Sequence, residues 1–271
     1  MGLFSFFKFF KLRCFSFTAS RDWLFRQSFA NAGLRSVTTD LTHGNSISST
    51  DMHCWIPKSP NRSKPNLLLV HGFGANAMWQ YGEHLRAFTG RFNVYVPDLL
   101  FFGLSSTSEP DRSESFQARC LMRLMEAHGV QRMNIVGISY GGFVGYSLAA
   151  QFPEKVEKIV LCCAGVCLEE KDMEDGLFKV MCTEFVEEKR DLIKSILKNR
   201  RLSDLPKIKQ KSLIIWGEED QIFPLELGYR LKSHIGENAE IVVIKKAGHA
   251  VNLEKSKEFL KHLKYFLIDS L

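Results

Sequence analysis

The chain has 271 residues, of which 45% are hydrophobic and 24% are charged, so it can bury the core of one α/β domain and two domains are not required. Its 36 basic and 30 acidic residues give a net charge of +6, but six of the basic residues and a single acid, Asp22, stand before Asp40. Because this surplus lies near the N-terminus, nucleic acid is not indicated as a partner. The seven cysteines include no C-x-x-C pair, which favours reduced thiols in a reducing compartment over a disulfide framework or a zinc site.

Residues 1–38 are expected to form a leader ahead of the globular domain. The first seventeen contain seven phenylalanines interrupted by Lys8, Lys11 and Arg13, and these charges come too early for a membrane span of about twenty apolar residues. Read as a helix, the segment has one apolar face, made of Leu3, Phe6, Phe7, Phe10, Cys14 and Phe17. The myristoylation pattern fails, since Phe6 stands where it requires Ser or Thr.

Three interpretations of this leader stay open. It is a membrane-surface anchor through residues 1–17, an organellar targeting peptide, or a disordered tail. The predicted location is therefore intracellular, either cytoplasmic, peripheral to a membrane, or inside an organelle.

The globular domain is expected over residues 39–271 as strands that alternate with helices. Strands are predicted at 39–41, 52–56, 66–70, 92–98, 133–137, 156–164, 212–217 and 239–244. Helices are predicted at 115–129, 140–152, 225–236 and 256–271. This alternation indicates an α/β fold in which a mostly parallel central sheet has helices on both faces.

The stretch GISYGG, residues 137–142, places Ser139 between the end of a predicted strand and the start of a helix. Gly137 and Gly141 are the small residues that a tight strand-to-helix turn needs, because such a turn brings two backbones close together. A G-x-S-x-G pattern also occurs by chance. In this setting, however, it favours a nucleophilic serine over an ordinary glycine-rich loop.

A nucleophilic serine needs a base to take its proton and a third group to orient that base. Among the eight histidines, His249 is the candidate base, because it follows the last predicted strand, and reactive residues of a parallel sheet lie at the carboxyl ends of strands. Asp220 in WGEEDQIFP is the candidate orienting acid, whereas Glu218 and Glu219 beside it are expected to stay solvated. Asp98, which ends an earlier strand, is interpreted as a turn-stabilising acid.

An oxyanion hole completes the predicted site. HGFG at residues 71–74 follows a predicted strand and can offer the backbone N–H of Phe73, and the residue after the nucleophile can offer the N–H of Tyr140. The alternative is a glycine turn without a catalytic role. Chemistry by this site needs no metal and no organic cofactor, and the expected partner is a small-molecule ester substrate.

Residues 39–271 resemble the α/β-hydrolase family, in its branch with a serine nucleophile, through HGFGANAMWQ, VPDLLFFGLSST, GISYGG, WGEEDQIFP and GHAVNLE. The order Ser139, Asp220, His249 is the one expected in that family and differs from the two main serine protease orders. DLLFFG and DQIFPLE look most like plant-type carboxylesterases and monoacylglycerol lipase-like members. The resemblance implies the α/β-hydrolase fold and hydrolysis of a carboxylic ester, such as a lipid or monoacylglycerol. A serine at this position argues against relatives that use an aspartate to open epoxides or displace halides.

One departure from the family concerns its helical cap, here expected at about residues 166–208 and shorter than usual. It contains one convincing helix, whose apolar line is Phe185, Leu192, Ile193, Ile196 and Leu197, and GLFKVMC is interpreted as the mark of a deletion. Because such a cap walls the acyl pocket, a short one is expected to leave the pocket open. Three alternatives therefore stay open: a small-ligand receptor on the same scaffold, a carbon–carbon bond hydrolase, and a form that the shortened cap leaves inactive.

Overall fold

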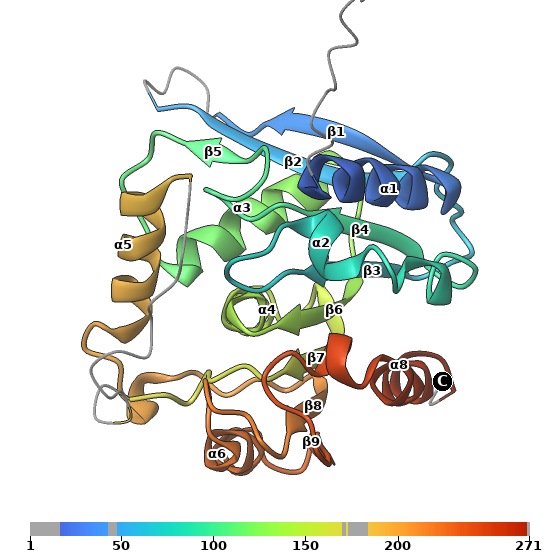
Figure 1. Ribbon diagram of the computed structural model, residues 1–271. Coiled ribbons are helices and arrows are strands. Elements are labelled where there is room, and N and C mark those ends of the chain that lie inside the picture. The colour runs from blue at the N-terminus through green and yellow to red at the C-terminus, as the bar shows by residue number, and fades with distance from the viewer. Residues whose placement is uncertain (1–16, 43–47, 170–171, 173–183, 270–271) are drawn as a thin grey trace, which may run out of the picture.

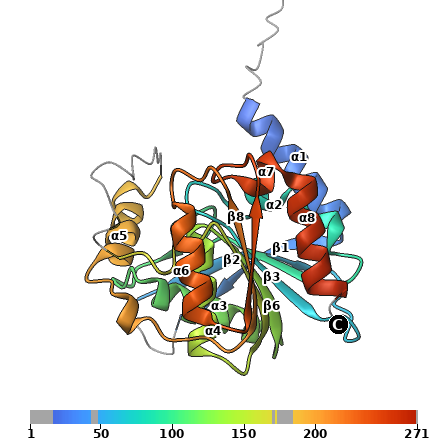
Figure 2. The same ribbon diagram turned by 90° about the horizontal axis from the view of Figure 1, so that it is seen from below.

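The computed structural model describes residues 17–42, 48–169, 172 and 184–269. Within these residues, nine strands form one sheet with helices on both faces (Figures 1 and 2). The strands are β1 (Leu34–Asp40), β2 (Thr50–Pro57), β3 (Asn66–Val70), β4 (Asn93–Pro97), β5 (Ser106–Thr107), β6 (Met133–Ile138), β7 (Val156–Cys162), β8 (Lys211–Gly217) and β9 (Ala239–Ile244). The helices are α1 (Phe17–Asn31), α2 (Ala77–Tyr81), α3 (Glu114–Ala127), α4 (Tyr140–Gln151), α5 (Val186–Leu197), α6 (Leu225–Ile235), α7 (Val251–Glu254) and α8 (Ser256–Lys264), with the short turns η1 (Leu85–Ala87), η3 (Leu202–Asp204) and η4 (Tyr265–Asp269).

The sheet is mostly parallel, with the strand order β1-β2-β4-β3-β6-β7-β8-β9. The strands from β4 to β9 along this path pair in parallel, whereas β1 and β2 run antiparallel to their neighbours and β5 pairs with β2 at the side. Parallel neighbours end at the same edge of the sheet, so the loops after β3, β6, β8 and β9 all open there. The predicted fold class is confirmed, and these four loops are the ones that carry the predicted site residues.

The core lies in two layers, one on each face of the sheet. In β3, Leu67 and Leu69 belong to the layer with α1, α2 and α8, while Leu68 and Val70 belong to the layer with α3, α4 and α6 (Figure 2). Successive side chains of a strand point to opposite faces, so a strand covered on both sides needs the continuous apolar run seen in NLLLV. Each such side chain contributes about 1.5–3 kcal/mol on burial, which holds β3 at the centre of the sheet.

The folded domain begins before residue 39, which corrects the predicted boundary. Helix α1 buries Phe25 and Phe29, and the Phe29 ring lies 4.9 Å from the Trp55 ring of β2. Strand β1 then begins at Leu34 and pairs with β2 along its whole length. Phenylalanines four residues apart place both rings on one face of a helix, so α1 covers the antiparallel end of the sheet. Residues 1–16, which carry most of the predicted anchor, lie outside the described residues.

In the cap, α5 is the helix that the sequence predicts. Leu192 and Ile196 are buried, whereas Phe185 is 38% exposed and lies just before the first helical turn, so it does not belong to the buried line. The GLFKVMC segment falls outside the described residues. Among the helices that the structure describes, none combines the length and the apolar character that crossing a bilayer requires.

Candidate active site

Ser139 lies on a strained turn between β6 and α4. Its φ of 52° and ψ of −120° place it in a region of backbone space that residues other than glycine rarely adopt. A Cβ atom on Gly137 would stand 2.5 Å from the carbonyl oxygen of Gly141, and one on Gly141 would stand 2.4 Å from that of Val70. Both glycines are therefore required by the close approach of β3, β6 and α4.

The structure brings Ser139, His249 and Asp220 together from three separate loops. His249 Nε2 lies 2.9 Å from Ser139 Oγ, and His249 Nδ1 lies 2.9 Å from Asp220 Oδ2 and 3.1 Å from Asp220 Oδ1. The Asp220 side chain is fully buried, whereas that of His249 is 25% exposed. The row therefore runs from a buried carboxylate, through an imidazole, to a partly accessible hydroxyl.

The position of the Asp220 carboxylate is fixed by the loop that follows β8. The backbone N–H groups of Ile222 and Phe223 both donate to Asp220 Oδ1 at 2.9 Å. The Phe223 ring then packs edge-on against the His249 imidazole, with ring centroids 5.5 Å apart. Because the carboxylate accepts from backbone amides, it faces the imidazole as an acceptor, and His249 Nδ1 carries the proton. In the neutral imidazole the free lone pair is then on Nε2, where it can take the proton of Ser139.

The two other acids of this loop point elsewhere. Glu218 and Glu219 are exposed, and Glu218 Oε2 accepts from the backbone N–H of Lys246 at 3.1 Å. Of the three acids in this loop, Asp220 is therefore the one that bonds His249.

The two predicted oxyanion donors belong to segments that adjoin Ser139. Tyr140 is the first residue of α4, and the loop that carries Phe73 approaches so closely that a Cβ on Gly72 would stand 3.2 Å from Ser139 Cβ. The Phe73 and Tyr140 rings pack edge-on, with centroids 5.9 Å apart. Within the described part of the chain, the backbone N–H groups of Phe73 and Tyr140 donate to no other group. They are therefore free to bind a negatively charged oxygen at this point.

His71 holds the same loop against the end of β4. Its Nε2 accepts from the Leu99 N–H at 2.9 Å, so its Nδ1 carries the proton and donates to the Gly72 carbonyl at 2.8 Å. Burial is the main reason that the pKa of His71 is lowered from its ordinary value. This bonding pattern requires a neutral His71. In the charged form, Nε2 would also carry a proton, and that proton would point at the Leu99 N–H.

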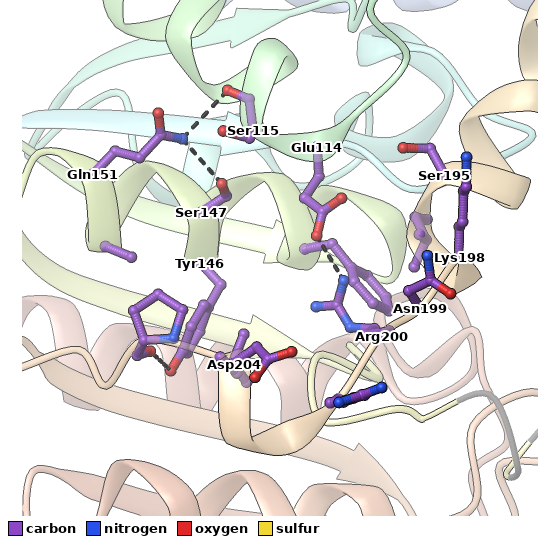
Figure 3. A pocket seen from close by; sticks show the side chains of 16 residues that line it. Glu114, Ser115, Tyr146, Ser147, Gln151, Ser195, Lys198, Asn199, Arg200 and Asp204 are labelled. Atoms are coloured by element: carbon purple, nitrogen blue, oxygen red, sulfur yellow. Dashed lines mark hydrogen bonds and ion pairs between the residues drawn. The ribbon is translucent and has the colours of Figure 1, made fainter.

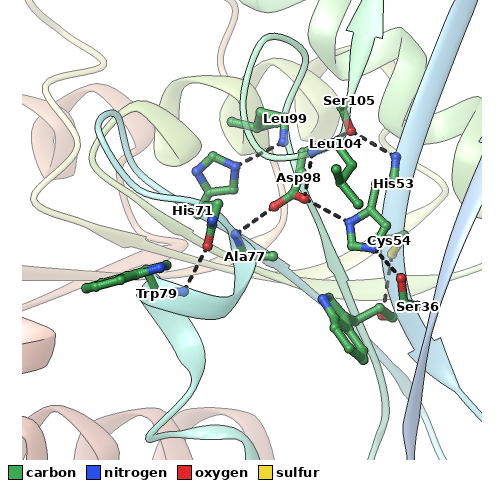
Figure 4. Close-up of polar contacts among 12 residues, drawn as sticks. Ser36, His53, Cys54, His71, Ala77, Trp79, Asp98, Leu99, Leu104 and Ser105 are labelled. Atoms are coloured by element: carbon green, nitrogen blue, oxygen red, sulfur yellow. Dashed lines mark hydrogen bonds and ion pairs between the residues drawn. The ribbon is translucent and has the colours of Figure 1, made fainter. Parts of the chain in front are cut away.

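Asp98 joins several backbone segments. It takes no part in the hydrogen-bonded row of Ser139, His249 and Asp220. Asp98 Oδ1 accepts from the Ala77 N–H at 2.8 Å, and Asp98 Oδ2 accepts from the Leu104 N–H at 3.3 Å (Figure 4). Its Oδ2 also lies 2.8 Å from Nδ1 of His53 on β2. Burial alone would raise the pKa of Asp98, but the His53 hydrogen bond, the nearby histidines and the Ala77 amide outweigh it, and the pKa is lowered. Asp98 stabilises turns as predicted, and its partner His53 carries no signal in the sequence that would have revealed the pairing.

Cys163 is a neighbour of the row that the sequence does not indicate. Among the described residues, its Sγ, an oxygen of Asp220 and a nitrogen of His249 form one group of potential metal ligands, all within 4.8 Å of one another. A hydrogen bond with Cys162, together with burial, raises the pKa of the Cys163 thiol. Metals bind the thiolate, and the other two side chains already bond each other, so this group is better explained as packing beside the acid and the base.

A cavity of about 370 Å³ lies between α3, α4 and the end of the cap (Figure 3). Phe143 lines the cavity and packs against Phe223, and Phe223 in turn packs against His249. At its wall, Arg200 Nη1 lies 2.6 Å from Glu114 Oε1, and the Arg200 guanidinium also donates to the Val166 carbonyl. This half-buried ion pair fastens the cap to α3. The cavity is lined by none of the three residues of the row.

Residues 65–185 match the family model described as "alpha/beta hydrolase fold". An uncharacterized protein of Mycobacterium tuberculosis strain H37Rv is 38% identical over 103 residues, a match that covers 38% of this chain but only 30% of that relative. A 2-hydroxy-6-oxononadienedioate/2-hydroxy-6-oxononatrienedioate hydrolase of Paraburkholderia phymatum is 27% identical over 252 residues, which covers 75% of this chain and 87% of the relative.

Solved structures share the fold. MGS-M2, an α/β-hydrolase enzyme from a Medee basin deep-sea metagenome library, superposes with a TM-score of 0.73 at 23% identity, covering 84% of this chain and 97% of that one. At this level of identity, the likeness concerns the arrangement of the backbone and not the substrate.

Proposed function

We propose that this chain, whose residues 65–185 match the α/β-hydrolase family model and whose backbone has that fold, is a serine hydrolase that cleaves a carboxylic ester through an acyl-enzyme intermediate. The observation that carries the proposal is the row of Ser139 Oγ, His249 Nε2 and Asp220 Oδ2, with consecutive distances of 2.9 Å and 2.9 Å. A hydroxyl, an imidazole and a buried carboxylate in this order are the groups that acyl transfer needs.

In the first half of the reaction, Ser139 Oγ attacks the ester carbonyl carbon as its proton passes to His249 Nε2. Asp220 keeps the imidazole in the correct tautomer and stabilises the imidazolium that forms. The negative oxygen of the tetrahedral intermediate is bound by the N–H groups of Phe73 and Tyr140, and each such donor is worth about 3 to 4 kcal/mol in the transition state. The imidazolium then protonates the departing alcohol.

In the second half, a water molecule takes the place of the alcohol. His249 removes a proton from this water as it attacks the acyl carbon, and the proton returns to Ser139 Oγ when the acid product leaves. Every proton in this cycle passes through His249 Nε2. The proposed reaction therefore needs only side chains and backbone N–H groups of this chain.

The substrate class that we propose is an ester with an apolar acyl group, such as a lipid or a monoacylglycerol. Phenylalanine rings pack against the neighbours of the reacting hydroxyl: Phe73 packs against Tyr140, and Phe223 packs against His249 and Phe143. Apolar walls with a few convergent polar groups are typical of sites that bind apolar ligands. A short cap would leave this surface accessible to long acyl chains.

A second candidate is cleavage of a carbon–carbon bond next to a carbonyl group. It is favoured by the Paraburkholderia phymatum relative, whose name specifies a 2-hydroxy-6-oxo dienedioate substrate without an ester, so that its hydrolysis must break a carbon–carbon bond. The same serine, histidine and aspartate would serve either reaction. Turnover of different substrates therefore distinguishes the two candidates, whereas mutation of these three residues does not.

The test compares the full-length protein with Ser139→Ala on p-nitrophenyl butyrate, on a monoacylglycerol and on a 2-hydroxy-6-oxo dienoate. We expect multiple turnover of the esters, and a loss on the order of 10⁴-fold or more in kcat for Ser139→Ala with the circular dichroism spectrum unchanged. Ser147→Ala, on the same helix, is the matched control and should retain activity.

A fluorophosphonate probe gives an independent readout. It should label Ser139 and should fail to label that position in Ser139→Ala, because only an assembled site activates the hydroxyl. Turnover of the dienoate alone would replace the ester proposal with the second candidate. Ligand-dependent thermal stabilisation without any turnover would indicate a receptor, and neither labelling nor turnover would indicate an inactive form.

A further inference from the structure

A second row of serine, histidine and aspartate lies away from the proposed active site. Ser36 Oγ on β1 lies 2.7 Å from His53 Nε2 on β2, and His53 Nδ1 lies 2.8 Å from Asp98 Oδ2 at the end of β4 (Figure 4). These contacts have the same atom order as those of Ser139, His249 and Asp220. We propose that Ser36 is a second activated hydroxyl, which accepts an acyl group from an activated ester and keeps it as a covalent modification.

The hydrogen bonds around Asp98 set the direction of proton movement in this row. The Ala77 and Leu104 N–H groups donate to Asp98, so the side chain accepts with both oxygens and is a carboxylate. His53 Nδ1 must then carry the proton that it shares with Asp98 Oδ2. The neutral imidazole keeps its lone pair on Nε2, and this atom faces the hydroxyl of Ser36. The base is therefore oriented in the way that a serine nucleophile requires.

Burial differs along the row in a way that suits a reactive surface group. His53 and Asp98 are 3% and 4% exposed, whereas Ser36 is exposed on the outer strand of the sheet. The buried carboxylate and imidazole keep a fixed geometry that solvent does not disturb. The hydroxyl, in contrast, can be reached by a reagent from solution.

The register of β1 also leaves one backbone donor, the N–H of Ser36 itself, near this hydroxyl. The bonds from Lys58 N to the Gly33 oxygen and from Leu41 N to the Thr50 oxygen mark the hydrogen-bonded pairs at the two ends of the β1–β2 ladder. Counting in steps of two from these pairs, Ser36 lies at a position whose N–H points away from β2. Because β1 ends the strand order, this N–H faces the open edge of the sheet, where it can approach the oxygen of an attacked carbonyl.

The step balances without any further reagent. Ser36 Oγ bonds to the acyl carbon while its proton moves to His53 Nε2. The bond from the acyl carbon to the leaving oxygen then breaks, and His53 returns the proton to that oxygen, which yields one alcohol or phenol and one Ser36 ester. Nothing is oxidised or reduced.

The same strand provides an internal comparison. Thr39 Oγ1 lies 3.1 Å from His128 Nε2, so this pair also joins a hydroxyl to an imidazole. In the described part of the chain, however, His128 makes no hydrogen bond to a carboxylate. If the carboxylate matters, Ser36 should react and Thr39 should not. Ser63, exposed and bonded to Asn61 instead of an imidazole, is a second reference.

The experiment uses the full-length Ser139→Ala protein, so that the first hydroxyl is absent, and treats it with p-nitrophenyl acetate. We expect one acetyl group per molecule, mapped by peptide mass spectrometry to Ser36 at a level at least tenfold above Ser63 and Thr39. The label should disappear in Ser139→Ala/Ser36→Ala and fall at least tenfold in Ser139→Ala/His53→Gln.

Equal labelling of Ser36, Ser63 and Thr39 would overturn the proposal, as would undiminished labelling of Ser36 in a folded His53→Gln variant. If His53→Gln does not fold, the ratio of Ser36 to the two reference residues in Ser139→Ala alone decides the question. Because every arm lacks Ser139, the result is independent of the ester hydrolase proposed above.

Discussion

The Asp98 carboxylate accepts from the Ala77 N–H at 2.8 Å, and this bond ties the end of β4 to the loop that carries Phe73. Asp98→Asn would put an amide N–H₂ opposite either the Ala77 N–H or the Leu104 N–H, so one backbone donor would lose its acceptor. We expect the free energy of unfolding to fall by about 1–3 kcal/mol and kcat to fall as the loop shifts. Urea unfolding and ester turnover measure the two effects.

Glu83→Gln is the control for Asp98→Asn. It lies at an exposed position and should change the free energy of unfolding by less than about 1 kcal/mol. An equally small effect of Asp98→Asn would contradict the role of Asp98 in holding the loop.

Gly141→Ala tests whether close packing fixes the turn at Ser139. The added Cβ would stand 2.4 Å from the Val70 oxygen and 2.5 Å from the His71 oxygen, so β3 or α4 must move. Overpacking of this kind costs about 1–3 kcal/mol, and activity should fall by at least tenfold because the hydroxyl and the oxyanion donors lie on the segments that move. The melting temperature and kcat/KM are the measurements. Gly90→Ala, where a Cβ meets nothing within 4 Å, is the matched control, and similar effects at both positions would argue against the packing explanation.

The residues of the candidate site were predictable from sequence because each belongs to a short local pattern. GISYGG requires two glycines around one serine, and the structure shows atoms within 2.5 Å of where their Cβ atoms would be. WGEEDQIFP offers three acids, and Asp220 is favoured because the Ile-Phe-Pro that follows turns the loop inward. In the structure, the Ile222 and Phe223 N–H groups of that turn donate to its carboxylate. A parallel sheet then places these loops at one edge, which needs no knowledge of individual contacts.

The parts that the sequence did not predict depend on contacts between distant segments. The sequence assigns α1 to the leader because its region contains arginine and serine and is poor in acids. In the structure, however, Trp79 Nε1 donates to Asp22 Oδ1 at 2.6 Å and Phe25 fills the space beside Gly82. His53 looked like an ordinary strand residue because its partners, Ser36 and Asp98, lie on two other strands. Only the pairing of β1, β2 and β4 brings these side chains together.

Asp220→Asn should separate the orienting role of this residue from its structural role. The Asn oxygen can still accept from the Ile222 and Phe223 N–H groups, so we expect the fold to be retained. The imidazole of His249, however, would lose the carboxylate that fixes its tautomer, and kcat should fall by about 10³ to 10⁴-fold. Steady-state kinetics on a p-nitrophenyl ester measures this loss, and Glu219→Gln is the control. Full activity of Asp220→Asn would remove Asp220 from the mechanism.

Mild acid should destabilise the protein through buried neutral histidines. Burial lowers the pKa of both His71 and His84 from the ordinary value of 6.5. Between the folded and unfolded pKa values the unfolded chain binds more protons, so the stabilisation is complete above about pH 6.5 and is lost as the pH falls toward the folded pKa. The melting temperature, measured from pH 8 to pH 5.5, should therefore fall below pH 6.5. His84→Gln removes one of the two groups and should flatten this slope, whereas an unchanged slope would assign the effect to other groups.

We propose that the N-terminal residues bind an anionic lipid surface, and the charges of the leader make this measurable. Lys8, Lys11 and Arg13 stand among phenylalanines, and Trp23 and Leu24 are exposed on α1 shortly after them. Basic residues near an anionic bilayer contribute about 1 kcal/mol each, so replacing all three by serine should weaken binding by about 100-fold. Co-sedimentation with phosphatidylserine-containing vesicles measures the affinity, which should also fall when salt is added.

A matched pair of variants tests whether α1 takes part in this binding. Trp23→Ser/Leu24→Ser removes two apolar side chains from α1 and should lower vesicle binding further, because both would enter the headgroup region beside the leader. Tyr265→Ser removes an equally exposed aromatic ring from η4 and should leave vesicle binding unchanged. If both variants bind as the unmodified protein does, residues 1–16 act without α1. If the triple serine variant of the leader also binds normally at low salt, the membrane proposal fails and a targeting or tail role is left.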